Sequence, residues 1–288
     1  MIKVDLVMWT KNGEKTLPLV LKRINRVIPA TYTNERVIVD DHSIDNTREI
    51  AKSFGWNVIF NEGKGIADAA NTALKYVVSE YFISFEQDLL LALDWWKKIP
   101  RYLTLPNVVI ASGIRLPYKP LALKKVQEYV MERYQRSEKA ESFFYGKTLD
   151  NTIYKTEIIK QLGGFPKLSI SAGIDTVLAH RIHMKGFRWV VDYNVRSTHL
   201  REGLKDELDH YYWYGTCAPT LEHILYNRSC NLKGMALRAF FSPVRGFHIA
   251  IKKRVPEAIY IYPLIRFSVF SGFLAGRNFM SQDAVFTH

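Results

Sequence analysis

The first third of the chain alternates between short apolar runs and amphipathic segments, and this alternation constrains the fold more than any other feature. Runs typical of buried strands are followed by segments with the period of a helix, and turn residues separate them. The expected strands are residues 2–10, 36–41, 56–60 and 81–85, and the expected helices are residues 14–27, 46–54 and 66–78. The sequence therefore predicts an α/β fold with a doubly wound, mostly parallel sheet.

Polar side chains gather at the carboxyl ends of three of these expected strands. The clusters are Thr10-Lys11-Asn12, Asp40-Asp41-His42-Ser43 and Glu86-Gln87-Asp88. Because ligands of doubly wound sheets bind at the carboxyl ends of the strands, we expect the three clusters to meet in one crevice. Carboxylates in such a crevice can hold Mg²⁺ or Mn²⁺, which bridges the oxygens of a nucleotide diphosphate.

Several common classes of protein are excluded. The loop after the first expected strand reads WTKNGEKT, without the GxGxxG of a dinucleotide-binding domain, and the chain lacks the GxxxxGKS/T of a P-loop. Cys217 and Cys230 lack CxxC partners and make neither a zinc site nor a disulfide framework, which favours a reducing cytosol. With 48% apolar and 24% charged residues the composition is that of an ordinary globular protein, which excludes disorder.

The pattern beyond residue 98 is less regular. We expect helical segments at residues 121–141, 151–162 and 175–185, on either side of the Gly163-Gly164-Phe165-Pro166 turn. A strand is expected at residues 189–195, and His199 follows it. This part of the chain is expected to complete the α/β domain.

Five blocks of sequence, taken together and in this order, are specific for one protein family, although each block alone is a weak signal. They are RVIVDDHSIDNT, NEGKGIADAANTAL, YFISFEQD, YKTEIIKQLGGFPK and AGIDTVLAHRIHMKGF. Over residues 1 to about 200 the chain thus resembles family 2 glycosyltransferases. The resemblance implies a GT-A fold and an inverting enzyme that uses a nucleotide-diphosphate sugar. We expect a catalytic domain at residues 1–227, with a nucleotide-sugar-binding half at 1–98 and an acceptor-side half at 99–227, and a helical C-terminal region at 228–288.

The resemblance also implies roles for individual positions. The nucleotide sugar would be bound by Thr10, Asn12, Asp40, Asp41, Lys64, Gln87 and Arg181. Glu86 and Asp88 would be the metal-binding DxD motif, with His199 placed to meet the metal. Asp175 would be the general base that takes a proton from the acceptor hydroxyl.

Four features depart from the family pattern. Glu86 stands in place of the first Asp of the metal motif, and Ile174 stands where a Glu often precedes the base. Ala70 stands where an Arg is common, so contacts to the diphosphate would fall to Lys64 or to the metal. The QxxRW motif of processive polysaccharide synthases is absent, which favours transfer of a single sugar.

Other interpretations stay open from the sequence alone. The acids at positions 40, 41 and 175 are residue types that cap helices, and a lone His after a strand is often structural. A sugar-phosphate nucleotidyltransferase has a related sheet, but its glycine-rich basic loop is represented only by Lys11 and Gly13. A non-catalytic nucleic-acid-binding protein would need its cations in a stripe on the core.

The positive charge is concentrated at the C-terminal end. The chain has 40 basic and 28 acidic residues, a formal charge of +12, and residues 228–288 hold nine basic and two acidic residues, or +7. Such an excess favours an anionic partner. Residues 257–277 are the best candidate span, but Pro263 and Arg266 lie inside them. Helices in the membrane interface are therefore favoured over a transmembrane helix, and packing on the core or a partner subunit is the alternative.

These features together predict where the enzyme works. The N-terminal strand carries Asp5 where a secretory signal would need an apolar core, so no signal is expected. We expect a cytoplasmic enzyme at the cytoplasmic face of the membrane, which it would touch peripherally through residues 228–288. Its acceptor would be lipid-linked or a surface glycan, and no nucleic-acid partner is expected.

Overall fold

The computed structural model describes residues 3–135, 146–201, 203–227 and 231–283. The contacts within the chain divide it into two compact units. The first comprises Met1–Leu116, Ser137–Ser169 and Ile174–Leu200, and the second comprises Pro117–Arg136, Ile170–Gly173 and Arg201–His288. The expected end of the catalytic domain at residue 227 stays a prediction, because compactness does not define where the catalytic residues end.

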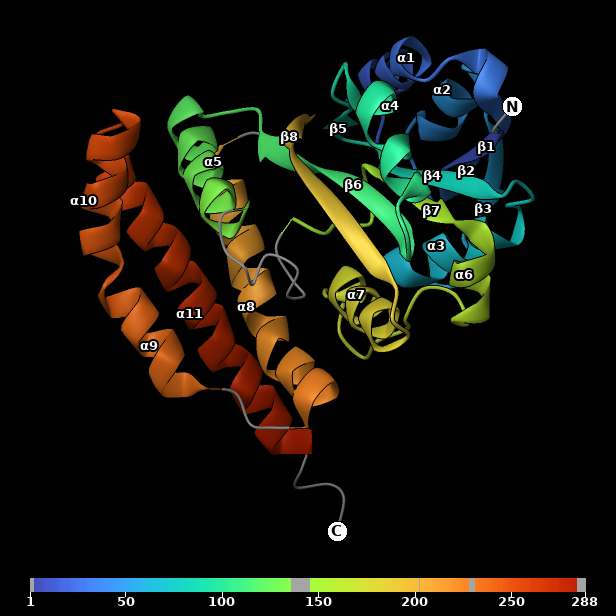
Figure 1. Ribbon diagram of the computed structural model, residues 1–288. Coiled ribbons are helices and arrows are strands. Elements are labelled where there is room, and N and C mark those ends of the chain that lie inside the picture. Colours follow the sequence, from blue (N-terminus) through green and yellow to red (C-terminus); the bar gives the residue numbers. More distant parts are fainter. Residues whose placement is uncertain (1–2, 136–145, 202, 228–230, 284–288) are drawn as a thin grey trace. The chain divides into compact units, whose positions relative to one another are not determined.

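The core of the first unit is an eight-stranded sheet, counted over the described residues, in the order β3-β2-β1-β4-β7-β6-β8-β5 (Figure 1). Four neighbouring strands are parallel: β1 (Val4–Thr10), β2 (Thr33–Asp40), β3 (Asn57–Phe60) and β4 (Tyr81–Glu86). These four strands are the ones expected from the alternating pattern. Their carboxyl ends lie along one edge of the sheet, as the site prediction requires.

The remaining strands correct the expectation of a mostly parallel sheet. They are β5 (Leu89–Leu90), β6 (Val108–Pro117), β7 (Thr152–Lys155) and β8 (Arg188–His199). The pairs β4/β7, β6/β7 and β5/β8 are antiparallel, so the sheet is mixed. Helical crossovers keep the first four strands parallel, whereas β7 runs antiparallel between β4 and β6, and β5 runs antiparallel to β8. Residues 151–162 form β7 and then α6 (Thr156–Gln161), because the β-prone Thr152-Ile153-Tyr154 pairs with β4.

Helices cover both faces of the sheet, and every residue of β1 is therefore buried. Leu6 and Met8 belong to an apolar cluster with residues of the first two helices, whereas Val7 and Trp9 belong to a second cluster with residues of α3 and α7. This alternation follows from the two-residue period of a strand. The helices of this unit are α1 (Leu17–Val27), α2 (Thr47–Ser53), α3 (Gly65–Lys75), α4 (Trp95–Lys98), α6 and α7 (Ile174–Met184), with 3-10 turns η1 (Ala30–Tyr32) and η2 (Pro100–Thr104).

The second unit is helical. It contains α5 (Leu121–Gln135), α8 (Leu204–Tyr226), α9 (Leu232–Phe240), α10 (Ser242–Lys253) and α11 (Ala258–Asp283). In Figure 1, α11 lies between α8 on one side and α9 and α10 on the other. The part of the expected helix beyond residue 135 lies outside the described residues. Among the described helices, α11 is the one that is long and apolar enough to cross a membrane, judged by length and composition over Ala258–Arg277.

Candidate active site at the carboxyl ends of the strands

The loops that follow β1, β2 and β4 are tied together by hydrogen bonds. Asn12 N donates to Ser43 Oγ at 2.8 Å, and Ile44 N donates to Asn12 Oδ1 at 3.0 Å. The side chain of Gln87 spans Lys11, accepting from its N at 2.8 Å and donating to its O at 2.9 Å. The expectation that the three polar clusters meet at one edge of the sheet is therefore confirmed. The Thr10 hydroxyl also bonds to Gln87 Oε1.

Two neighbouring acids end β2 in different surroundings. Asp40 is fully buried; its Oδ2 accepts from Ser43 N at 3.0 Å, and its Oδ1 has no hydrogen bond within the described structure. Asp41 accepts from Asn61 Nδ2 at 2.7 Å and pairs with Lys11 Nζ at 3.2 Å. Burial acts to raise the pKa of Asp41, but these two partners outweigh it and hold the pKa below its ordinary value. Asp41 is therefore an ionised acceptor at the rim of the site.

Lys64 follows β3 and immediately precedes α3. Its backbone N donates to Asp68 Oδ2 at 3.0 Å, which closes the first turn of the helix. Asn61, the partner of Asp41, also donates to Gly65 O at 3.2 Å. This pair of bonds places the start of α3, and hence Lys64, beside the loop that carries Asp41.

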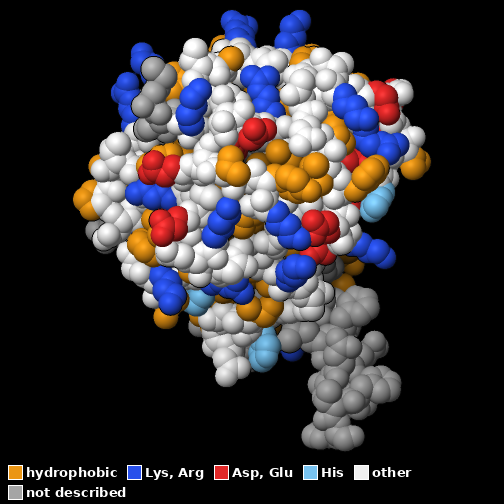
Figure 2. Space-filling view, turned by 90° about the vertical axis from the view of Figure 1, so that its right-hand side faces the viewer, with side chains coloured by type: hydrophobic (Ala, Val, Ile, Leu, Met, Phe, Trp, Pro, Cys, Tyr) orange, Lys and Arg blue, Asp and Glu red, His pale blue; other side chains and the backbone are white. Residues whose placement is uncertain are grey.

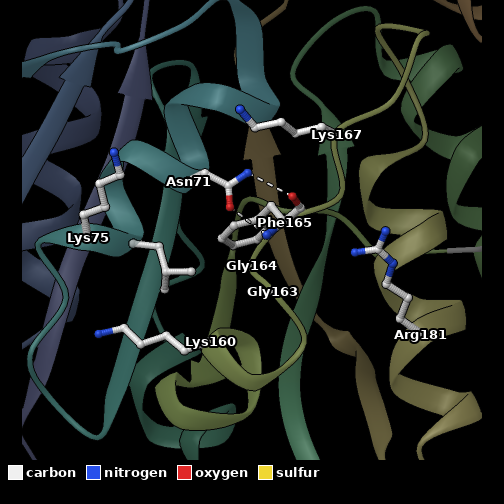
Figure 3. Close-up of a pocket in the computed structure, with 9 residues that line it drawn as sticks. Asn71, Lys75, Lys160, Gly163, Gly164, Phe165, Lys167 and Arg181 are labelled. Atoms are coloured by element: carbon white, nitrogen blue, oxygen red, sulfur yellow. Dashed lines mark hydrogen bonds between the residues drawn. The ribbon is translucent and has the colours of Figure 1, made fainter.

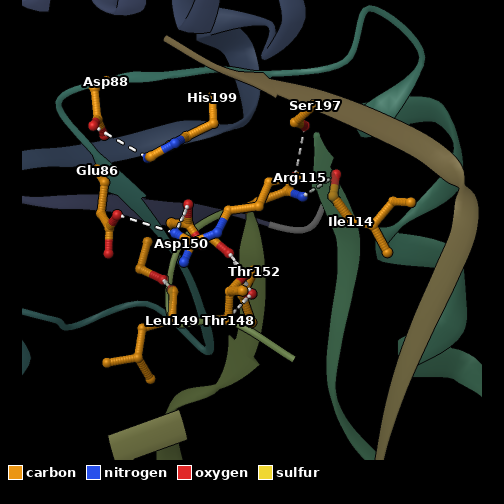
Figure 4. A network of polar contacts seen from close by, with 12 residues as sticks. Glu86, Asp88, Ile114, Arg115, Thr148, Leu149, Asp150, Thr152, Ser197 and His199 are labelled. Carbon is orange, nitrogen blue, oxygen red and sulfur yellow. Dashed lines mark hydrogen bonds and ion pairs between the residues drawn. The ribbon is translucent and has the colours of Figure 1, made fainter. Parts of the chain in front are cut away.

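Glu86, Asp88 and His199 form a group that can hold a metal ion (Figure 4). One ligand atom from each lies within 4.8 Å of the others. Backbone pairing brings them together, because Leu89 lies opposite His199 in the β5/β8 pair and Leu200 N donates to Asp88 O at 2.7 Å. His199 Nε2 lies 3.1 Å from Asp88 Oδ2 but is buried and makes no hydrogen bond with the described residues. A buried imidazole nitrogen beside two carboxylates fits a divalent cation.

Two charged residues of this site were not identified from the sequence. Arg115 Nη1, on β6, lies 3.3 Å from Glu86 Oε2 and 3.2 Å from Asp150 Oδ2 (Figure 4). Asp150 is fully buried just before β7, and its Oδ1 has no hydrogen bond within the described structure. The available signals were an arginine inside the apolar run VVIASGIRLP and an acid at the turn LDNT. Neither could be placed without the antiparallel strands.

The turn that carries Asp150 is fixed by the next residue. Asn151 has a φ of 60°, and its Nδ2 donates to Ile114 O at 3.3 Å while Ser197 Oγ donates to its Oδ1 at 3.0 Å. Gly113 makes this approach possible, because a Cβ at that position would lie 2.6 Å from Val195 O. Three strands thus hold Asp150 in place behind Glu86.

The pKa of Glu86 reflects this crowding. Burial and the neighbouring Asp150 raise it to about 8, against the opposing charge of Arg115. One arginine therefore does not offset both the partly exposed carboxylate of Glu86 and the buried carboxylate of Asp150. A cation bound between Glu86 and Asp88 would favour the ionised form of Glu86.

Asp175 lies in the first turn of α7 and accepts a hydrogen bond from Thr176 N at 2.7 Å. Burial raises its pKa, while the Thr176 bond and the charge of Arg115 oppose the rise and Asp150 adds to it. Asp175 is thus electrostatically linked to the same Arg115 and Asp150 that contact Glu86. An acid with a raised pKa is a stronger base than an exposed aspartate, which suits it to proton transfer.

Arg181 lies six residues beyond Asp175 on the same helix, about 9 Å along the axis. It lines a separate cavity of about 650 Å³ with Asn71, Phe165 and three lysines (Figure 3). The lysines already have partners: Lys75 pairs with Glu62, Lys167 with Asp68, and Lys160 donates to Val77 O. The structure therefore places Arg181 at this cavity, and its role in binding the nucleotide sugar stays a prediction.

The sequence profile described as Glycosyl transferase family 2 matches residues 5–163, more than half of the chain. The chain belongs to this family, which confirms the resemblance carried by the five sequence blocks. The matched region contains the strand-end loops and the Glu86-Gln87-Asp88 segment described above.

Individual proteins are similar over different lengths. The chain is 36% identical over 90 residues to UDP-Glc:alpha-D-GlcNAc-diphosphoundecaprenol beta-1,3-glucosyltransferase WfgD of Escherichia coli, a match that covers 30% of this chain and about a third, 34%, of that enzyme. The mannosyltransferase PcManGT from Pyrobaculum calidifontis, solved with GDP-Man and Mn²⁺, has a TM-score of 0.59 at 19% identity and covers 98% of this chain and 79% of its own. TarS of S. aureus, residues 1–349, has a TM-score of 0.56 at 16% identity, covering 98% and 92%. The fold is the GT-A fold of these glycosyltransferases.

Family and fold decide between the alternatives left open by the sequence. A nucleotidyltransferase and a non-catalytic nucleic-acid-binding protein are both set aside by the family match. On the face of the molecule in Figure 2, Lys and Arg side chains are spread among acidic and apolar ones and do not form a continuous stripe. That face lacks the charge pattern that a nucleic-acid backbone would need.

Proposed function

We propose that the protein is a metal-dependent, inverting glycosyltransferase that moves one sugar from a nucleotide-diphosphate sugar to a lipid-linked or glycan acceptor. The observation that carries the proposal is the group of Glu86, Asp88 and His199 beside the linked loops of β1 and β2. A ligand at this edge of the sheet can meet a cation and nucleotide-binding side chains at once.

Glu86, Asp88 and His199 would hold Mg²⁺ or Mn²⁺, and the bound ion supplies positive charge to the departing diphosphate. Arg115 keeps Glu86 in place by its ion pair and shares its charge with Asp150. His199 Nε2 is buried and lies 3.1 Å from Asp88 Oδ2 without a hydrogen bond, which supports this role because buried polar atoms are ordinarily satisfied.

The loops after the first three strands would bind the nucleotide. Asp41 is ionised and half-enclosed, which suits an acceptor for a ribose hydroxyl or a base N–H. Thr10, Asn12, Asp40 and Gln87 fix the loop geometry around it through their hydrogen bonds. Lys64, at the start of α3, would meet the base or the diphosphate, in place of the arginine that Ala70 replaces.

Asp175 would act as the general base. Its carboxylate takes the proton of the acceptor hydroxyl as that oxygen bonds to the anomeric carbon and the bond to the nucleoside diphosphate breaks. The raised pKa makes Asp175 a stronger base than an exposed aspartate. Attack from the face opposite the nucleotide inverts the anomeric centre in a single displacement.

The acceptor is proposed to be lipid-linked. The name of the E. coli relative states a diphosphoundecaprenol-linked acceptor, although the match covers only a third of that protein. The basic, aromatic-rich residues 228–288 would bring this chain to the cytoplasmic face of the membrane, where a lipid-carried sugar is presented. A panel of donors and cations distinguishes the sugar, the base of the donor and the choice between Mg²⁺ and Mn²⁺.

The proposal is tested with a panel of UDP-, GDP- and dTDP-sugars, each with Mg²⁺, Mn²⁺ or EDTA. We expect one donor class to raise the melting temperature of the protein and to be hydrolysed slowly, both only with a divalent cation. A panel in which no donor shifts the melting temperature with either cation would contradict the proposal.

A further inference from the structure

Helix α10 exposes an apolar stripe that the catalytic site does not use. Val244, Phe247 and Ile251 are 69%, 57% and 65% exposed. Their spacing of three and four residues puts them on one side of the helix. Leu237, Phe240 and Phe241, at the end of α9 and the junction with α10, are also exposed and extend the apolar surface.

The stripe points away from the rest of the unit. Gly246, Ile249 and Ala250 are the buried side of α10, and a Cβ on Gly246 would lie 2.7 Å from Ala258 O of α11. At about 100° per residue, the centre of this buried side lies about 140° from the centre of the exposed stripe. The helix therefore has two apolar sides, and only one of them is explained by packing within the chain.

Cations flank the exposed stripe. Arg245 and Lys252 each follow a stripe residue by one position and are exposed, as is Arg238 on α9. Residues 231–256 contain six Lys and Arg and no Asp or Glu. Two of the six have partners within the unit: Lys253 pairs with Glu132 at 2.7 Å, and Lys252 Nζ lies over the Tyr129 ring, 5.5 Å from its centroid. The combination of exposed Phe, Val and Ile with a basic flank is typical of a helix that lies in a membrane interface.

We propose that α9 and α10 form an in-plane docking face for an anionic bilayer. The docking face consists of Leu237, Phe240, Phe241, Val244, Phe247 and Ile251, flanked by Arg238, Arg245 and Lys252. The inference rests on the proposed membrane contact of residues 228–288. It assigns that contact to the docking face and to helices that lie in the plane of the membrane interface. The apolar side chains enter the acyl boundary, and the cations meet lipid phosphates.

Charge distinguishes a bilayer from a second copy of the chain. A two-fold interface would bring this face against itself, and each copy would contribute only cations from residues 231–256. Like charges at such an interface repel, whereas an anionic headgroup layer neutralises them. The docking face fits the lipid surface.

Helix α11 does not span the membrane in this arrangement. Its Gly272 and Gly276 pack directly on the backbone of α8, and Gly215 of α8 packs on the backbone of α11. Helix α8 carries Lys205, Asp206, Glu207 and Asp209 in its first turns, which are costly to place in hydrocarbon. Because α11 is packed along this charged helix, it stays outside the hydrocarbon and supports α10 from behind.

The test measures binding of the full chain to vesicles of phosphatidylcholine, with or without phosphatidylglycerol, in the absence of any donor. The apolar variant is Val244→Gln/Phe247→Gln/Ile251→Gln, and the charge variant is Arg238→Gln/Arg245→Gln/Lys252→Gln. The matched control, Leu19→Gln/Val78→Gln/Leu105→Gln, changes three exposed apolar residues of the first unit. The melting temperature, measured without donor, verifies that each variant is folded.

We expect the apolar variant to lose about tenfold or more of its partitioning into both kinds of vesicle. The charge variant should lose its preference for phosphatidylglycerol, and the control should bind like the unchanged chain. Alkaline carbonate should release the unchanged chain from the vesicles. Resistance to carbonate would overturn the in-plane mode, and equal binding by the apolar variant and the control would overturn the docking face.

A change from dimer to monomer in the apolar variant, with no vesicle binding by the unchanged chain, would assign the face to a second copy and overturn the proposal. Because no arm requires a donor, failure here leaves the glycosyltransferase assignment untouched. The converse also holds, since a missing donor response would not affect vesicle binding.

Discussion

The two edges of the sheet at which β1 to β4 begin and end hold buried polar side chains in opposite situations. Near the amino end of β1, the buried Asp5 accepts hydrogen bonds from Val78 N and Ser79 N at 2.7 Å each and from the Ser79 hydroxyl at 2.8 Å. Asn34 Nδ2 and Glu35 N complete the set at 3.0 and 3.1 Å. Near the carboxyl ends, Asp40 Oδ1, Asp150 Oδ1 and His199 Nε2 are buried without a hydrogen bond in the described structure.

The pKa values of the two ends separate accordingly. Burial acts to raise the pKa of Asp5, but the bonds from Ser79 and Val78 outweigh it and hold the pKa below its ordinary value. Burial raises the pKa of Glu86 and of Asp175, and nothing within the described structure fully compensates it. An acid whose oxygens all accept hydrogen bonds stabilises the fold. A buried polar atom without a hydrogen bond is instead a candidate for binding a ligand.

The largest expected effect follows from removing a proposed metal ligand. Asp88→Ala should lower sugar transfer by about 10³-fold or more, because a bound cation stabilises the leaving diphosphate by several kcal/mol. The fold should persist, since Asp88 supplies charge at a strand end rather than packing. The measurement is the transfer rate with the donor that the panel identifies, together with the melting temperature.

The matched control is Asp94→Ala, which removes an exposed acid near the same loop whose carboxylate pairs with the exposed Lys98 at 2.6 Å. Its transfer rate should equal that of the unchanged protein. Full activity of Asp88→Ala, or full activity of the unchanged protein in excess EDTA, would show that the carboxylate cluster does not act through a metal.

Asp175→Asn keeps the size of the side chain and can still accept from Thr176 N, but it cannot take a proton. We expect turnover to fall by about 10²-fold or more while donor affinity changes little. Steady-state kinetics and donor titration of the same variant give the two quantities. Equal losses in both would assign Asp175 to donor binding instead.

The raised pKa of Asp175 also predicts a pH dependence. A base must be ionised, so activity falls as the pH drops through its pKa. Because that pKa lies above the ordinary value of 3.8, the acidic limb of the rate profile should lie at higher pH than for an exposed aspartate. A profile without an acidic limb above that value would contradict the assignment.

At the opposite end of the sheet, a substitution should affect stability rather than chemistry. Asp5→Asn places an amide NH₂ against the donors of Val78 and Ser79, and we expect a loss of about 2–3 kcal/mol in the free energy of unfolding. The stabilisation by Asp5 is full above the unfolded-state pKa and is lost as the pH falls toward the lower pKa of the folded state. Urea unfolding across that pH range measures both effects, and stability unchanged by the substitution would overturn them.

The smallest expected effect is on stability at the site itself. Glu86→Gln should leave the melting temperature unchanged or raise it slightly, because Glu86 and Asp150 compete for the single positive charge of Arg115. Because the pKa of Glu86 is raised, its protonated form adds to the free energy of unfolding at acidic pH, and this contribution is lost as the pH rises through about 8. The glutamine amide does not titrate, so the variant lacks this pH dependence. A marked fall in melting temperature would place Glu86 with the structural acids.

Much of this arrangement could be predicted from the sequence, because it depends on local patterns. The first four strands and their helices follow from periodicity, and the meeting of Asn12, Asp41 and Gln87 follows from the parallel arrangement of strand ends. The family was recognisable because its blocks are contiguous in sequence.

The remainder depends on pairing between distant segments. Arg115 and Asp150 reach Glu86 only through the antiparallel strands β6 and β7, which are short or irregular in pattern. Arg181 shares a helix with Asp175 and lines a cavity with Asn71 and Phe165, which residue spacing alone did not show. The sequence pattern does not show which side of α10 faces outward and which is buried, because both sides are apolar.

The central claim is that the carboxyl ends of the strands hold a divalent cation together with the donor, while Asp5 only holds the fold. Electron paramagnetic resonance of free Mn²⁺, titrated against protein with and without a nucleoside diphosphate, tests it most directly. We expect the unchanged protein and Asp5→Asn to bind one Mn²⁺ with the nucleotide, and Asp88→Ala to bind none. Equal Mn²⁺ binding by Asp88→Ala and the unchanged protein would contradict the account.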